Sequence, residues 1–209
     1  MKTAYVITID GPSAAGKGTI AKLLAERLGA IYIPSGNIYR ALAKLMQDNA
    51  TKPDDVQAIC VLSDQIKTDD IYSADLNNEE IASTASKMAA YAQVRDTVSL
   101  ILHKLAKQHK KIIAEGRDMG SVVFQNADLK IFITANLESR AIRRYKELQE
   151  RGIKVIYEQL VDDLKKRDER DASRVNSPLI VPANAFVVDS SKMTIQETLD
   201  YVVELVEKM

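Results

Sequence analysis

One stretch of the sequence decides the fold class: Ile7-Thr8-Ile9-Asp10-Gly11-Pro12-Ser13-Ala14-Ala15-Gly16-Lys17-Gly18-Thr19. Apolar, β-branched residues lead into a turn bracketed by Gly11 and Gly16, and apolar residues at helical spacing follow Lys17. The two glycines let the backbone curl so that successive N–H groups point at an anion. The positive end of the following helix dipole points at the same place. A strand, the pattern G-x-x-x-x-G-K and a helix together predict a loop that binds the phosphates of a nucleotide.

The residue after the lysine departs from the common form of this motif. The common form has Ser or Thr there, with its hydroxyl on Mg²⁺, whereas this chain has Gly18 and places Thr19 one position later. No side chain is therefore assigned to the metal. The variant G-K-G-T resembles the loop of nucleoside monophosphate kinases, in which the phosphates of the two substrates and water hold most of the magnesium.

Length and composition indicate a compact α/β domain with room for a small inserted lobe. The 209 residues are 46% hydrophobic, and 29 basic residues balance 29 acidic ones. A net charge of zero argues against a partner such as nucleic acid or a membrane surface. Cys60 is the single cysteine and cannot form an internal disulfide. Strand-like sequence by Tyr5 leaves no room for a signal peptide, and no apolar run approaches the about 18 residues of a membrane span, so we expect a cytoplasmic protein.

The hydrophobic periodicity alternates between strands and helices. Strands are predicted at residues 5–10, 30–33, 111–114, 129–133 and 186–188. Helices are predicted at residues 17–28, 37–48, 54–66, 79–88, 93–108, 137–150, 157–171 and 195–208, with Gly29 as a C-cap, Ser35 as an N-cap and residues 67–78 irregular. Strands separated by helices predict an α/β fold of three layers, a parallel sheet covered by helices on both faces. Ligands of such sheets lie beyond the carboxyl ends of the strands.

Four groups of charged residues fall in loops or helix starts at that edge of the sheet. They are Lys17, residues 34–40 with Arg40, residues 116–118, and residues 167–174. The last group has Arg167, Arg170, Asp171 and Arg174 at three- and four-residue spacing, which predicts one shared helical face. Phosphoryl transfer between two phosphate-bearing substrates needs such positive charge, because the protein must neutralise the phosphates, align them and exclude water. The chain offers no Ser/His/Asp set and no Cys/His metal cluster.

The residues of these groups resemble the motifs of bacterial cytidylate kinases over nearly the whole chain. Residues 9–19 resemble the phosphate loop of that family, and Ser35-Gly36-x-x-Tyr39-Arg40 resembles its acceptor-phosphate motif. Residues 116–124, Gly-Arg-Asp-Met-Gly-Ser-Val-Val-Phe, resemble its most specific segment. Residues 167–171 and 178–183 resemble its lid. The resemblance implies an enzyme that transfers a phosphoryl group from ATP, with Mg²⁺, to CMP or dCMP.

The resemblance also implies roles for single residues. For ATP these are Gly11, Pro12, Ser13, Ala14, Ala15, Gly16, Lys17, Gly18, Thr19 and Arg143, and for catalysis Lys17, Arg117, Arg170 and Arg144. For CMP they are Ser35, Tyr39, Arg40, Ser86, Arg95, Arg117, Asp118, Arg167, Asp171 and Arg174. Ser35, Arg40 and Arg117 would hold the acceptor phosphate. Ser86, Arg95 and Asp118 would read the cytosine edge, and Asp171 would contact the ribose. A carboxylate accepts from the amino group of cytosine, which uracil lacks, so Asp118 favours cytidine.

The domain organisation expected is a single kinase domain in three parts. The core would comprise residues 1–34, 109–140 and 183–209, the monophosphate-binding lobe about 35–108, and the lid about 141–182. Two departures from the family pattern stand out: Glu115 replaces an Asp, and residues 66–80 are shorter than the usual insertion. We expect small-molecule partners only and a monomer.

Alternatives within the same class are other small-molecule P-loop kinases, such as a UMP-preferring kinase. From another class, the alternative is a nucleotide-binding switch without transfer. A GTPase switch would need D-x-x-G and N-K-x-D, and neither pattern occurs in the chain.

Overall fold

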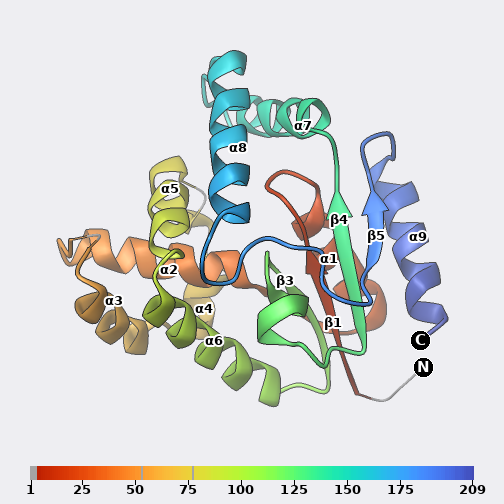
Figure 1. Ribbon diagram of the computed structural model, residues 1–209, viewed down its shortest axis with the longest axis horizontal. Coiled ribbons are helices and arrows are strands. Elements are labelled where there is room, and N and C mark those ends of the chain that lie inside the picture. Colours follow the sequence, from red (N-terminus) through yellow and green to blue (C-terminus); the bar gives the residue numbers. More distant parts are fainter. Residues whose placement is uncertain (1–3, 53, 77) are drawn as a thin grey trace. The chain divides into compact units, whose positions relative to one another are not determined.

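The computed structural model describes residues 4–52, 54–76 and 78–209 (Figure 1). The chain divides into two compact units. The core unit comprises Met1–Tyr32 and Lys110–Met209, and the inserted unit comprises Ile33–His109. Within the described residues, no helix is both long and apolar enough to pass through a bilayer.

The sheet has five strands in the order β2-β3-β1-β4-β5. Their bounds are β1 Tyr5–Asp10, β2 Ile31–Pro34, β3 Lys111–Glu115, β4 Leu129–Thr134 and β5 Phe186–Asp189. β1 pairs in parallel with β3 and β4, and β4 pairs in parallel with β5. The boundary between the two units falls inside β2. Because β1 lies at the centre, the residues that follow it leave from the middle of the carboxyl edge of the sheet.

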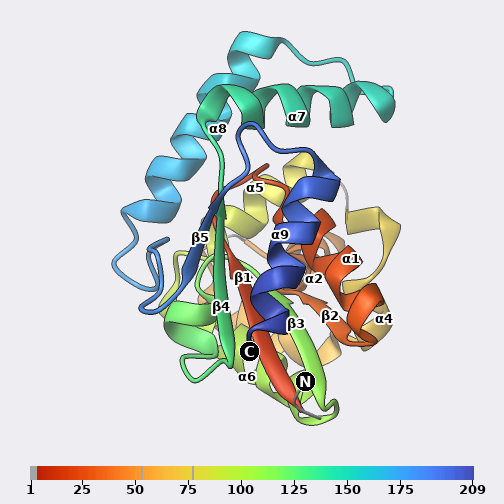
Figure 2. The same cartoon turned by 90° about the vertical axis from the view of Figure 1, so that its right-hand side faces the viewer.

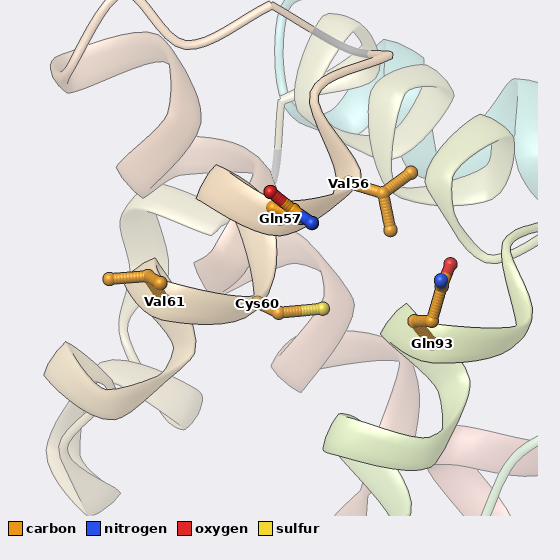
Figure 3. Close-up of a pocket in the computed structure, with 5 residues that line it drawn as sticks. All are labelled: Val56, Gln57, Cys60, Val61 and Gln93. Carbon is orange, nitrogen blue, oxygen red and sulfur yellow. The ribbon is translucent and has the colours of Figure 1, made fainter.

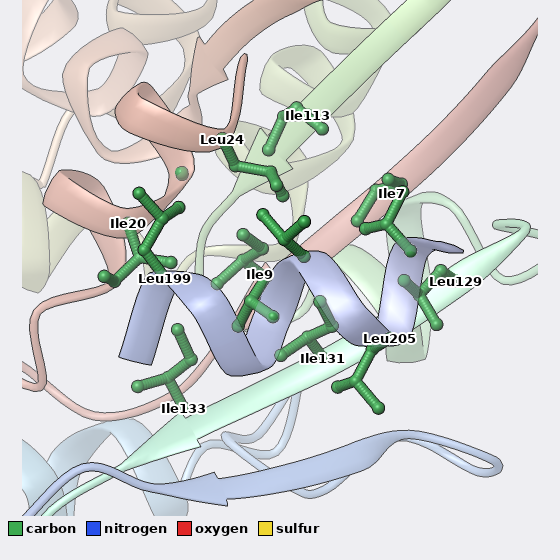
Figure 4. Packing of buried hydrophobic residues seen from close by; sticks show 14 of the residues in the cluster. Ile7, Ile9, Ile20, Leu24, Ile113, Leu129, Ile131, Ile133, Leu199 and Leu205 are labelled. Carbon is green, nitrogen blue, oxygen red and sulfur yellow. The ribbon is translucent and has the colours of Figure 1, made fainter. Parts of the chain in front are cut away.

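Helices of the core unit are α1 Lys17–Leu28, α7 Leu137–Glu150, α8 Tyr157–Ala172 and α9 Ile195–Glu207, together with a π-helical turn, η3, at Met119–Val123. Ile7 and Ile9 of β1 are fully buried among side chains of α1, α9 and neighbouring strands (Figure 4). Figure 2 shows α9 running along the sheet beside α1. Thr8 and Asp10, also fully buried, alternate to the other face of β1, which η3 contacts. Each buried Ile or Leu contributes about 1.5–3 kcal/mol.

Helices of the inserted unit are α2 Ser35–Asp48, α3 Val56–Leu62, α4 Thr68–Ile71, α5 Glu79–Met88 and α6 Ala92–Lys107, with 3₁₀ turns η1 Ser63–Gln65 and η2 Ala74–Leu76. Their apolar faces form a separate core that includes Leu42, Met46, Ile59, Met88 and Val94. The unit therefore buries its own hydrophobic residues, as a compact lobe must.

The structure confirms the α/β class and most predicted elements, and it corrects several boundaries. Ser35 is not an N-cap: it is the first residue of α2, and Pro34 takes the cap position without a side-chain hydrogen bond. The helix expected at 54–66 is shorter, because Asp55 caps α3 by accepting from the N–H of Ala58, 3.0 Å away. The irregular segment expected at 67–78 holds α4 and η2, and its described residues form no strand. Asn77 in that segment lies outside the described residues.

Candidate active site

The phosphate loop has the backbone conformation that the glycines predict. Gly11, Ala14 and Gly16 have positive φ angles of 145°, 59° and 86°. A Cβ on Gly11 would lie 1.9 Å from the carbonyl oxygen of Ile133, so only glycine fits where the loop leaves β1. Gly16 is the N-cap of α1 and has no side chain to cover the first N–H groups of the helix. The loop and the helix N-terminus therefore present backbone donors suited to an anion.

Lys17 is held at the centre of this loop. Its side chain is 4% exposed, and Nζ donates to the carbonyl of Pro12 at 2.8 Å. Nζ also lies 3.6 Å from Oε1 of Glu115, whose other carboxylate oxygen accepts from the hydroxyl of Tyr32 at 3.4 Å. Burial lowers the pKa of Lys17 to about 7, the nearby charge of Arg117 adds to this, and Glu115 opposes it. An anion brought to Lys17 would restore its charge.

Arg117 joins this lysine to α8. Its Nη1 lies 4.0 Å from Oε1 of Glu115, and its Nε donates to Oδ2 of Asp171 at 3.2 Å. Nη2 of Arg174 lies 2.5 Å from Oδ1 of the same Asp171, which is 1% exposed. Burial would raise the pKa of Asp171, but Arg117, Arg174 and Arg167 together hold that pKa below its ordinary value. Three predicted acceptor ligands thus form one charged cluster.

The prediction that residues 167–174 share one helical face is wrong at its last residue. α8 ends at Ala172, and Ser173 is its C-cap, so Arg174 lies beyond the helix. Arg174 reaches Asp171 from the loop instead.

Arg143 is fixed by backbone carbonyls rather than exposed beside the loop. Its Nη1 donates to Oγ of Ser190 at 2.9 Å and to the carbonyl of Ala15 at 3.4 Å, and its Nη2 donates to the carbonyl of Ser190. Arg144 lies next to it on α7, with Nη1 2.6 Å from Oε1 of Glu147. Arg143 therefore ties the phosphate loop to the turn after β5.

Arg140 was not singled out from the sequence, although the structure places it at the same loop. It is 6% exposed, and its Nη1 donates to the carbonyl of Ser13 at 3.2 Å. Its Nε donates to the carbonyl of Ala135 at 2.9 Å, and its Nη2 lies 2.6 Å from Oδ2 of Asp168 on α8. Arg140 thus connects the phosphate loop with α8. The only signal in the sequence is that Arg140 begins the stretch of residues 140–174, which holds seven of the eleven arginines of the chain.

In the inserted unit, five residues predicted to bind the acceptor lie on α2, α5 and α6. Ser35, Ser86 and Arg95 are buried, at 4%, 6% and 5% exposure. The guanidinium of Arg95 lies 5.8 Å from the ring centroid of Tyr39, and its Nη1 donates to the carbonyl of Ala89 at 3.0 Å. Nη1 of Arg40 donates to the carbonyl of Leu76 at 3.0 Å. Polar side chains this deeply buried are positioned groups rather than solvated ones.

A different part of the inserted unit holds an open pocket of about 410 Å³ (Figure 3). It is lined by Val56, Gln57, Cys60, Val61 and Gln93. None of these residues is a predicted nucleotide ligand, so this pocket does not mark the nucleotide site. Within the described residues, no group of three or more His, Cys, Asp or Glu side chains is placed to hold a metal ion.

Two solved structures show a similar fold over nearly the whole chain. A shikimate kinase from Bacteroides thetaiotaomicron matches with a TM-score of 0.52 and 13% identity, over 97% of this chain and 98% of that one. The protein TT1252 from Thermus thermophilus matches with a TM-score of 0.53 and 15% identity, over 99% and 98%. At these identities the likeness concerns the fold alone.

Sequence relatives are much closer. A cytidylate kinase of Aeromonas salmonicida is 42% identical over 98% of this chain and 95% of its own length. Those of Marinomonas sp. and Rickettsia africae are 40% and 38% identical, over 94% and 97% of this chain and 93% and 92% of theirs. The family model described as cytidylate kinase matches residues 7–208. This match and these identities over nearly the full length place the chain in the cytidylate kinase family.

Proposed function

We propose that this protein transfers the γ-phosphoryl group of ATP to CMP or dCMP and releases ADP and CDP or dCDP. The observation that carries the proposal is the chain of contacts from Lys17 through Glu115 and Arg117 to Asp171. It joins the lysine of the phosphate loop to the end of α8 that carries Arg170 and Asp171, and phosphoryl transfer needs such positive groups close to the phosphates. The family match favours this activity over the UMP-preferring kinase and over the switch.

ATP would bind at the loop that follows β1. Its phosphates would take the backbone N–H groups of residues 11–19 and the ammonium of Lys17. Arg143 would act on ATP through the loop, since it holds the carbonyl of Ala15.

The acceptor nucleotide would be held by the side chains that the sequence assigns to its phosphate, ribose and base. Ser35, Arg40 and Arg117 would bind its phosphate, with Tyr39 supporting them, and Asp171 would contact the ribose. Asp118, with Ser86 and Arg95, would read the base, because its carboxylate can accept from the amino group of cytosine. Arg167 and Arg174 would add charge at the acceptor phosphate.

Transfer itself needs alignment and neutralisation more than covalent chemistry. Arg170 and Arg144 would stabilise the charge of the transferred group, together with Lys17 and Arg117. An arginine in this role is worth about 10³–10⁵ in rate. We propose that residues 141–182 act as a lid that closes over the phosphates and excludes water.

The residues at the phosphate loop offer few oxygen ligands for Mg²⁺. Mg²⁺ keeps several waters and binds through one or two carboxylates and the phosphates of its substrate. Glu115, 3.6 Å from Lys17, is a carboxylate at the phosphate loop, and Thr19 is exposed at the start of α1. When bound, the ion neutralises charge on the phosphates. We propose that phosphates and water supply its other ligands.

The remaining proposals follow from this function. The partners would be small nucleotides, with no nucleic acid and no membrane, and the protein would be a cytoplasmic monomer.

The proposed function is tested with ATP labelled at the γ-phosphate. Incubated with CMP and Mg²⁺, the protein should move the label into CDP. A sample without acceptor should release little labelled phosphate. Release of phosphate without CDP would instead support a hydrolysing switch.

A further inference from the structure

Two of the proposed acceptor ligands, Arg117 and Asp118, lie in a segment that is attached to β1 at both ends. At its start, the N–H of Gly116 donates to the carbonyl of Ile9 at 3.1 Å. At its end, the carboxylate of Asp10 accepts from the N–H of Met119 at 2.8 Å through Oδ1 and from the N–H of Gly120 at 2.7 Å through Oδ2. The attachment points are the last two residues of β1, directly before Gly11 of the phosphate loop.

The turn that follows is closed tightly against Asp10. The carbonyl of Asp118 accepts from the N–H groups of Val122 and Val123, at 2.9 and 3.1 Å, which fixes the backbone of Asp118 itself. A Cβ on Gly120 would lie 2.7 Å from Oγ1 of Thr8 and 3.3 Å from Oδ2 of Asp10. The turn has no space to shift toward β1, so the carboxylate sets its position.

Asp10 is costly to bury, and the phosphate chemistry does not use it directly. Its side chain is 0% exposed. Burial raises its pKa to about 7, while the two backbone N–H groups and Lys17 favour the charged form. A carboxylate accepting two backbone N–H groups makes charge-assisted bonds that are stronger and shorter than neutral ones. These bonds fix the segment that carries Arg117 and Asp118.

We propose that Asp10 is a positioning residue that holds Arg117 and Asp118 in register with the phosphate loop and thereby sets recognition of the acceptor nucleotide. This inference rests on the proposed function, because it assigns Asp10 a part in binding the acceptor of that reaction. The ATP site and the acceptor site are then both held by the end of β1, the first through the phosphate loop and the second through the bonds of Asp10.

The first test is Asp10→Asn, which keeps one oxygen acceptor but turns an amino group toward the other backbone N–H. We expect the KM for CMP to rise by about 10- to 100-fold, the range known for the loss of a group that orients a metal-binding side chain. The preference for CMP over UMP should fall, and the KM for ATP should stay close to its original value. The matched control is Asp128→Asn, because the carboxylate of Asp128 also accepts from a backbone N–H of β1, that of Val6 at 2.9 Å, near the amino end of the strand. It should leave all three quantities unchanged.

A second variant covers the case in which Asp10→Asn does not fold. Gly120→Ala keeps Asp10, but its Cβ would lie 2.7 Å from Oγ1 of Thr8 and would push the turn away from β1. It should therefore give the same loss on the acceptor. In an Asp118→Asn background, the Asp10 change should no longer alter the preference for CMP over UMP. Equal losses for ATP and CMP, or no loss in either variant, would overturn the proposal.

Amide hydrogen exchange tests the same contact without any assay of activity. The N–H groups of Met119 and Gly120 should be protected in the unaltered protein and exchange faster in the folded Asp10→Asn variant. Unchanged protection would refute the role of Asp10. Wild-type protein that does not phosphorylate CMP, with these amides still dependent on Asp10, would instead refute the proposed function and leave the contact intact.

Discussion

At the scale of single residues, the charge of Lys17 depends on its surroundings. Its pKa of about 7 reflects burial and the nearby Arg117, so at pH 8 most molecules carry a neutral lysine. Phosphates placed against it raise this pKa. ATP binding at pH 8 should therefore take up a proton, whereas at pH 6 it should take up none at Lys17, which is already charged. Calorimetry in two buffers of different ionisation enthalpy measures the uptake.

Lys17→Met is the control for this measurement. The variant should lose the uptake and about 10²–10³ in rate, the usual effect of removing one preorganised donor. The same proton uptake in wild type and variant would assign the titration to another group.

Arg117 supports a second prediction. It lies at the centre of the cluster with Glu115 and Asp171, and Arg117→Ala should lower turnover by about 10³–10⁵. The control is Arg27→Ala, which removes an exposed ion pair with Asp200, 3.6 Å long and worth about 0–1 kcal/mol. Circular dichroism should show both variants folded. Near-normal turnover in the Arg117→Ala variant would contradict the role of Arg117 in catalysis.

Residue identities in the phosphate loop could be read from the sequence, but their long-range partners could not. Asp10 stood in the quoted motif with no role, because its partners Met119 and Gly120 lie more than a hundred residues away. In the sequence Arg140 is one of many arginines, and only the fold brings it into contact with Ser13 and Asp168. A sequence motif predicts the conformation of its own residues. It does not predict hydrogen bonds between residues far apart in the chain, because these depend on how the chain folds.

At the scale of elements, two glycines with positive φ allow a matched test. Gly11→Ala would put Cβ 1.9 Å from the carbonyl oxygen of Ile133, so it should abolish ATP binding and destabilise the fold. Gly29 ends α1 with φ of 60° and has nothing within 4 Å of its Cβ position. Gly29→Ala should cost only about 1–2 kcal/mol from backbone strain and leave turnover unchanged. Denaturant unfolding and turnover assays check both. Normal ATP binding by Gly11→Ala would contradict this account of the loop.

The proposed lid predicts protection of α8. The phosphates of the two substrates should attract the arginines of α8, so hydrogen exchange of residues 157–172 should slow most when CMP and a non-hydrolysable ATP analogue are both present. Exchange that is unchanged by the two ligands together would count against closure. Residues 195–207 of α9 provide the internal reference, because that helix packs in the core.

Element boundaries were predictable where a strong local signal exists. Gly29 ends α1 as predicted, and the predicted bounds of α5 and α7 agree with the structure. Predictions were weaker at residues 54–78, where short helical turns replace a long helix and a loop. The bounds of these short helices depend on packing within the inserted unit. The hydrophobic periodicity of a few residues is too short a pattern to predict them.

At the scale of the whole molecule, the sequence predicted the parallel sheet, the phosphate loop and the family. The alternation of strands and helices indicated the α/β class without the strand order, since β3 inserts between β1 and β2 although it follows them by many residues. The nucleotide chemistry came from motifs spread along the chain, each at a strand end or helix start. Because all these motifs occur together in one family, the activity could be predicted from the sequence, whereas individual contacts between side chains could not.

The measurement that tests this account most directly is an ADP-release assay with ATP and Mg²⁺, run side by side on CMP, dCMP, UMP, AMP and shikimate. We predict strong turnover on CMP or dCMP and little on UMP, AMP or shikimate. Turnover confined to another acceptor would contradict the assignment of base recognition to Asp118 and of the reaction to cytidine nucleotides.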